Sequence, residues 1–174
     1  EALRDEHMSH IVAGMGIADM DFRAAPSITA ALKKRMEHEN WGYLDMGSPS
    51  PKAFSQGIID WNKRRYGINV VNHDNLGITT GVHSGLMAAL RVYAPPGSKV
   101  LMTTPIYNGF YYDLMGSRLV ANESVMKWTN GQYEIDWDDL ERRMTPDTKE
   151  TILGNPPNPT GRVWDDDELD TLAR

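Results

Sequence analysis

The sequence of 174 residues contains no cysteine. Disulfide bonds, thiolate metal sites and a cysteine nucleophile are therefore excluded within it, and a reducing compartment such as the cytoplasm is the expected location. Long apolar runs are also missing: the longest are short pieces such as residues 86–90, far below the roughly 18 residues that a membrane-spanning helix requires. Residues 1–7 are acidic rather than the basic start of a leader peptide, so we expect no export signal and no membrane association.

Positive charge is in deficit, with 18 Lys and Arg residues against 24 Asp and Glu residues and a formal net charge of −6. A protein that binds the phosphate backbone normally has the opposite balance, so nucleic acid is not an expected partner. Both ends of the sequence read as cut. It begins with Glu1, and residues 165–174 have the pattern of a helix that has only begun, with Asp165 as N-cap and Glu168 in capping-box position. We therefore expect the front portion of a longer protein.

The first part of the sequence predicts two helices. Pro26 is suited to the first helical position of a helix over residues 26–38. A second helix is expected over residues 51–66, with Ser50 as N-cap and Gly67 at the stop position. The apolar positions that share one face are Ile28, Leu32 and Met36 in the first helix and Phe54, Ile58 and Trp61 in the second.

From residue 76 onward, short apolar runs alternate with helical patterns. This alternation is typical of an α/β fold with a mostly parallel sheet and crossover helices, here incomplete and preceded by an N-terminal helical segment. We predict an N-terminal segment over residues 1–50 and the first part of the α/β domain over residues 51–174. The expected strands are 76–80, 99–103, 118–125 and 151–154, and the expected helices are 84–93, 108–115 and 136–143, the last capped by Asp136.

Three segments rich in polar residues or glycine follow the predicted strands: residues 80–84, 104–107 and 155–161. Because the carboxyl ends of parallel strands meet at one edge of a sheet, where such folds bind ligands, this edge is the predicted site. Gly81 precedes a helix, and the free amides there suit an anion, although an ordinary turn would also explain the glycine. Tyr107 could stack on a planar ligand or fill the edge of the core.

The segment at residues 155–161 carries three prolines and two asparagines, so a rigid loop presents amide side chains, and the Asn158–Pro159 bond is a candidate cis peptide. No metal site is expected. His7 and His10 are spaced for one helical face, but no third ligand is evident, and the acidic groups around Asp136 and Asp165 read as solvated helix starts.

These motifs, in this order, resemble the pyridoxal-phosphate-dependent enzymes of the aminotransferase class I/II superfamily, fold type I. The resemblance is carried by residues 158–161, Asn-Pro-Thr-Gly, and by residues 105–107, Pro-Ile-Tyr. The similarity narrows to the MalY/PatB branch, the cystathionine beta-lyase type that cleaves carbon–sulfur bonds. That narrower likeness rests on residues 19–22 with Ala25-Pro26, residues 41–43, residues 105–111 and residues 158–164.

The resemblance implies that pyridoxal 5′-phosphate is the cofactor. The backbone amides of Gly81, Val82 and His83 would then hold its phosphate, Tyr107 would stack on its pyridine ring, and Asn158 would hydrogen-bond to the phenolic oxygen of that ring. His83 departs from the apolar residue that the resemblance leads us to expect at its position.

The resemblance also implies a homodimer, in which Tyr43 would reach the phosphate bound in the neighbouring subunit. Ala18, through its backbone, and Asp19 would lie near a small amino-acid substrate. The Schiff-base lysine, the acidic partner of the ring nitrogen and the substrate arginine lie later in the chain in this family. We therefore expect no catalytic residue among these 174 and no activity from the segment alone.

The resulting prediction is a carbon–sulfur beta-lyase that removes the alpha proton of its substrate and eliminates a thiol, giving ammonia and a keto acid. Two alternatives stay open. One is an aminotransferase of the same fold, which differs in its products. The other is a non-catalytic regulatory or binding module, favoured if no suitable lysine follows residue 174.

Overall fold

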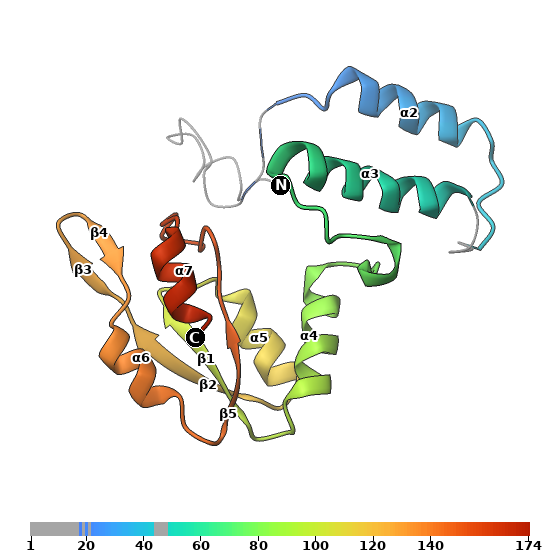
Figure 1. The fold of residues 1–174 in the computed structure, drawn as a ribbon. Helices are drawn as coiled ribbons and strands as arrows, with labels where there is room; N and C mark the ends of the chain where they lie inside the picture. Colours follow the sequence, from blue (N-terminus) through green and yellow to red (C-terminus); the bar gives the residue numbers. More distant parts are fainter. Residues whose placement is uncertain (1–17, 19, 21, 44–48) are drawn as a thin grey trace, which may run out of the picture. The chain divides into compact units, whose positions relative to one another are not determined.

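A computed structural model describes residues 18, 20, 22–43 and 49–174, which fall in two compact units, Glu1–Asn75 and Leu76–Arg174 (Figure 1). The domain boundary at residue 50 stays a prediction.

The first unit contains helices α2 (Pro26–Met36) and α3 (Pro49–Tyr66) and the short 3₁₀ helix η1 (His73–Asn75). Both predicted helices are confirmed. Helix α3 begins earlier than expected, at Pro49, so Ser50 lies in its first turn and the prediction of Ser50 as N-cap was wrong. Proline is tolerated in a first turn because the amide hydrogen that it lacks has no intrahelical partner there.

The predicted apolar face of α2 is exposed. None of the residues of α2 is buried, and Ile28, Leu32 and Met36 are each more than half exposed. An amphipathic helix of this kind is stabilised mainly by packing of its apolar side, which nothing in the described part of the chain covers.

The second unit is built on a parallel sheet, which confirms the predicted α/β fold class (Figure 1). Strand β1 (Lys99–Thr104) lies between β2 (Val120–Val125) and β5 (Thr148–Ile152) and pairs with both in parallel. Helices α4 (Val82–Tyr93) and α5 (Gly109–Gly116) separate the expected site segments from one another along the chain.

Alternation along β1 produces two cores. Val100 and Met102 face one side of the sheet, where Leu90 of α4 and Leu114 of α5 cover them. Leu101 faces the other side, together with a second set of buried side chains. Successive residues of a strand point to opposite faces, so one central strand supports both layers. The second set is Met126, Ile135, Leu140 and Trp164, with Leu169 and Leu172 packed against it.

The expected strand over residues 76–80 is not formed, and that prediction was wrong. A strand needs a hydrogen-bonded neighbour, and residues 76–80 pair with none of the strands in the described sheet, whose order is β2-β1-β5. Two other boundaries differ. Strand β5 begins at Thr148, where its pairing with β1 starts, and β2 begins at Val120 because Arg118 has a left-handed backbone conformation, with φ of 58°.

A hairpin of β3 (Lys127–Thr129) and β4 (Gln132–Glu134) was not predicted. Its turn is Asn130-Gly131, with φ of 51° and 83°, the backbone that a two-residue hairpin turn requires. Trp128 and Tyr133 face each other across the strands with ring centroids 4.8 Å apart. The Asn-Gly pair was the sequence signal that could have found this hairpin.

Helices α6 (Trp137–Arg143) and α7 (Asp166–Leu172) begin with the predicted caps. The Asp136 carboxylate accepts a hydrogen bond from the backbone amide of Asp139. Asp165 and Glu168 form the complete capping box, since each side chain accepts from the backbone amide of the other at 2.9 Å. Such reciprocal bonds satisfy amides that the helix itself leaves unpaired.

Asp139 joins α6 to the sheet. Its carboxylate accepts from Arg143 Nε at 2.6 Å and from the buried Ser124 hydroxyl at 2.9 Å, and it pairs with Arg142 at 3.0 Å. The hydrogen bond from Arg143, followed by that from Ser124, lowers the pKa of Asp139 below its ordinary value. The charged form is therefore the one that the fold stabilises.

Replacing Asp139 with Asn should lower the melting temperature of the full-length protein at pH 7. A carboxyl whose pKa is depressed on folding adds stability above its unfolded pKa of about 4, and this stability is lost as the pH falls through the folded value. The deficit of the variant should therefore shrink in thermal melts below about pH 4. Asp138→Asn, at the exposed neighbouring position, is the matched control. A deficit that stays constant down to pH 2 would contradict this explanation.

Candidate active site

The N-terminus of α4 has no side-chain cap. Gly81 precedes the helix with an extended backbone, and a Cβ built on it would meet nothing within 4 Å. The Ser84 hydroxyl donates to the carbonyl of Gly81 at 2.8 Å, and the Thr79 hydroxyl donates to the same carbonyl at 2.9 Å. The carbonyl of the turn is thus held, while Gly81 has no side chain that could cap the amides of the first turn. A helix start of this kind favours an anion.

The ring of Tyr107 lies close to this helix start. It follows β1, and its centroid is 5.9 Å from the imidazole of His83 and 5.5 Å from the ring of Phe110, the latter edge-on. Gly109 lies directly against the Tyr107 ring, because a Cβ built on Gly109 would come within 2.2 Å of Tyr107 Cε1. Tyr107 remains 36% exposed. Its ring is therefore held in place and still accessible to a planar ligand.

His83 pairs with a buried carboxylate. Its Nδ1 lies 2.7 Å and 2.9 Å from the two carboxylate oxygens of Asp113, whose side chain is only 4% exposed, against 53% for His83. The backbone placement of His83 beside Gly81 was predicted, but this side-chain contact was not. Asp113 is 30 residues away in the sequence and carries no motif of its own.

Asn158 is exposed and lies in the loop after β5, which contains hydrogen bonds of its own. The backbone amide of Gly161 donates to the carbonyl of Pro157 at 2.8 Å, and the indole of Trp164 donates to the carbonyl of Gly154 at 2.9 Å. The Asn158–Pro159 bond is cis, as the sequence suggested. Asn158 is thus an exposed residue of a loop whose backbone accepts two hydrogen bonds from within its own segment.

Two of the three predicted segments are in contact, through His83 and Tyr107. Asn158 joins the same edge of the sheet, since β1 and β5 are adjacent and parallel and the segments of Tyr107 and Asn158 follow their carboxyl ends. Tyr43 and Ala18 belong to the other unit and are exposed there, and Asp19 lies outside the described residues.

Tyr111 of α5 is not a candidate base. Its hydroxyl donates to Glu123, and desolvation by burial, with that hydrogen bond, raises the pKa of Tyr111 to about 12. The phenol therefore stays protonated near neutral pH.

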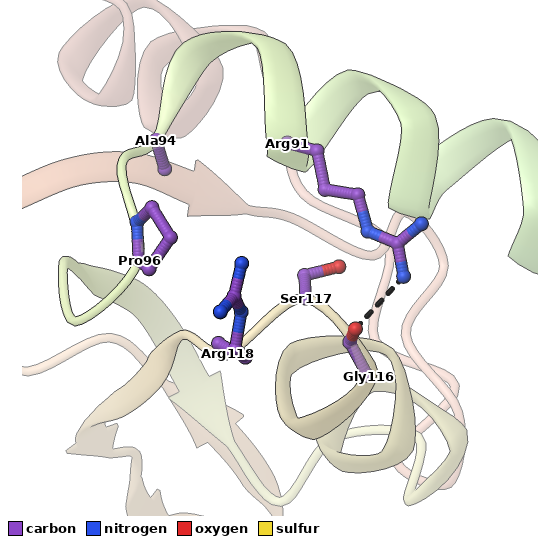
Figure 2. Close-up of a pocket in the computed structure, with 6 residues that line it drawn as sticks. All are labelled: Arg91, Ala94, Pro96, Gly116, Ser117 and Arg118. Carbon is purple, nitrogen blue, oxygen red and sulfur yellow. Dashed lines mark hydrogen bonds between the residues drawn. The ribbon is translucent and has the colours of Figure 1, made fainter.

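A hollow of about 360 Å³ lies at the other end of α4 (Figure 2). The side chain of Arg91 lines one side of it and donates to the carbonyl of Gly116 at 2.8 Å, and the hydroxyl of Ser117 is buried without a partner among the described residues. This hollow contains none of the predicted site residues.

Within residues 18, 20, 22–43 and 49–174, no group of three potential metal ligands was found, and no helix is long and apolar enough to cross a membrane.

The family described as aminotransferase class I and II matches residues 10–174. The chain belongs to this family. Cystathionine beta-lyase PatB of Bacillus subtilis (strain 168) is 35% identical to it over 158 residues, which are 89% of this chain and 39% of PatB. Protein MalY of Escherichia coli (strain K12) is 30% identical over 159 residues, 90% of this chain and 40% of MalY. The chain thus spans about two fifths of the length of these class I and II relatives.

Among solved structures, the crystal structure of a PLP-bound C–S lyase from Staphylococcus hominis is similar, with a TM-score of 0.83 and 30% identity over 90% of this chain and 40% of that one. The predicted family and fold are therefore confirmed, and so is PLP as the cofactor of the class I and II family. The roles of individual residues stay predictions.

Gly109→Ala should destabilise the full-length protein by about 1–3 kcal/mol, because the new methyl group would overlap the ring of Tyr107 and must displace it. Gly57→Ala is the matched control, since Gly57 is also helical and has nothing within 4 Å of an added Cβ. Without a clash, alanine in a helix stabilises by roughly 0.5–1 kcal/mol relative to glycine. Urea unfolding would measure both. A Gly109→Ala protein as stable as the parent would show that the ring is not confined.

Proposed function

We propose that the full-length protein is a pyridoxal-phosphate-dependent enzyme and that this chain supplies part of its cofactor site. The observation that carries the proposal is the contact between the open start of α4 and the ring of Tyr107. A flat, doubly negative cofactor needs an anion site and an aromatic surface beside each other. Here the helix start and the aromatic ring lie beside each other, with the ring centroids of His83 and Tyr107 5.9 Å apart.

The residues fit the group by their chemistry. The amides of Gly81, Val82 and His83 would hold the phosphate, where the dipole of α4 favours negative charge. Tyr107 would lie against the ring, and the amide of Asn158 would donate to the phenolic oxygen. When bound, pyridoxal phosphate supplies an electron sink for the alpha carbon of an amino acid.

For the reaction, we propose carbon–sulfur beta-elimination. The relatives named cystathionine beta-lyase and C–S lyase support it. The substrate would be a small amino acid with a thioether at its beta carbon. Loss of the alpha proton and of the thiol, followed by addition of water, gives a keto acid and ammonia. Ala18 and Asp19 are the proposed substrate contacts, and no lysine in these 174 residues is assigned a catalytic role.

An aminotransferase is the second candidate, because the matching family carries that name. The two candidates differ in what happens to the amino group. A lyase releases it as ammonia, whereas an aminotransferase passes it to a second keto acid.

We also propose a cytoplasmic homodimer in which Tyr43 reaches the phosphate site of the other subunit. The exposed side chain of Tyr43 supports this proposal, and so do the uncovered apolar residues Ile28, Leu32 and Met36 of α2. An exposed apolar stripe of this kind is typical of a surface that packs against another element or subunit.

The full-length protein, purified with pyridoxal phosphate and given cystathionine without any keto acid, should release thiol, ammonia and keto acid in equal amounts. Thiol would be measured with a disulfide reagent and ammonia with a coupled assay. Transfer of the amino group to added keto acid, with no thiol released, would establish the aminotransferase instead. Failure to bind pyridoxal phosphate at all would favour the binding module.

Tyr107→Ala should weaken pyridoxal phosphate binding by about 3- to 10-fold, the loss expected when one aromatic stacking contact is removed. Tyr112→Ala is the control, because Tyr112 is an exposed tyrosine on α5 without a predicted role. Titration of the cofactor-free protein, followed by visible absorbance, would give both dissociation constants. Equal affinities for the two variants would argue against the role of Tyr107.

A further inference from the structure

The carboxylate of Asp113 is buried in a place where a charge is costly. Asp113 is 3% exposed, and in the described part of the chain its side chain has His83 as its hydrogen-bonding partner. A carboxylate accepts hydrogen bonds, so the tautomer of His83 with a proton on Nδ1 is the one that satisfies it. A buried charge with a missing partner destabilises a fold strongly, so the two residues are expected to act as a unit.

This unit joins two elements of the candidate site. His83 lies in the first turn of α4, among the residues proposed to hold the phosphate, and Asp113 lies on α5, which begins immediately after the Tyr107 segment. Gly109 is in contact with both rings, since a Cβ there would come within 2.8 Å of His83 Cε1 as well as 2.2 Å of Tyr107 Cε1. The imidazole of His83, the phenol ring of Tyr107 and the start of α5 therefore pack against one another.

We infer that the His83–Asp113 pair is a positioning device that sets the spacing between the phosphate subsite and the aromatic ring of Tyr107. This inference rests on the proposed function. A ligand that occupies both subsites at once binds more tightly when their spacing is fixed in advance, because less conformational freedom is lost on binding. The pair acts through Gly81, Val82 and Tyr107, and it is not assigned any part in the chemical step.

The melting temperature of a double variant distinguishes this positioning role from a purely structural one. Replacing both partners of a hydrogen bond by apolar groups is often nearly neutral, because no buried polar group is then left without a partner. The double variant H83V/D113A should therefore keep the melting temperature of the cofactor-free protein. It should nevertheless lose affinity for a ligand that must bridge the two subsites.

The test uses the full-length protein as wild type, H83V/D113A and H83N. Cofactor-free protein would be titrated with pyridoxal phosphate, inorganic phosphate would be titrated by competition, and melting temperatures would be recorded without ligand. The double variant should bind pyridoxal phosphate about tenfold more weakly, the loss expected for a charge-assisted hydrogen bond. Its affinity for inorganic phosphate, which contacts the backbone amides of one subsite only, should fall by a clearly smaller factor.

H83N should restore most of the affinity. The side-chain nitrogen of asparagine occupies the position of Nδ1 in histidine and can donate to Asp113. Rescue by H83N, together with a loss of phosphate affinity that is clearly smaller than the loss of cofactor affinity, would support the inference.

Two results would overturn it. One is a double variant that binds pyridoxal phosphate as tightly as the wild type. The other is a parallel fall in melting temperature, phosphate affinity and cofactor affinity, which would mark the pair as structural only. A wild type that fails to bind pyridoxal phosphate would instead refute the proposed function, and the inference with it.

Discussion

The parallel pairing of β1 with β2 and β5 is the constraint on which the rest of the second unit depends. It buries β1 on both faces, so that Val100 and Met102 support one layer of helices and Leu101 supports the other. It also brings the carboxyl ends of β1 and β5 to the same edge. Short loops placed there are close to each other whatever their separation in the sequence, and this is why a site can be assembled from distant motifs.

Much of this arrangement could be predicted from the sequence, because the signals are local. The alternation of apolar runs and helical patterns predicted β1, α4 and α5, and the carboxylates of Asp136 and Asp165 predicted the starts of α6 and α7. An N-cap is a local feature, because its side chain accepts a hydrogen bond from a backbone amide only two or three residues later in the sequence. The turns at Gly81 and around Pro159 likewise have a local signature.

The failures have a different physical origin. Residues 76–80 have the composition of a strand, but a strand forms only by pairing with a neighbour, and these residues pair with none of the described strands. The apolar stripe of α2 was read correctly as a helix face, yet its burial depends on packing that is not local. The pairing of His83 with Asp113 joins two helices, and the sequence pattern of neither helix predicts it. Contacts of this kind become visible only in three dimensions.

The start of α4 and the ring of Tyr107 are proposed to be two halves of one cofactor site, and a crystal structure of the full-length protein with pyridoxal phosphate tests that claim most directly. We expect electron density for the phosphate at the amides of Gly81, Val82 and His83, with the pyridine ring against Tyr107. Density for the cofactor at any other place, with these amides bound only to water, would contradict it.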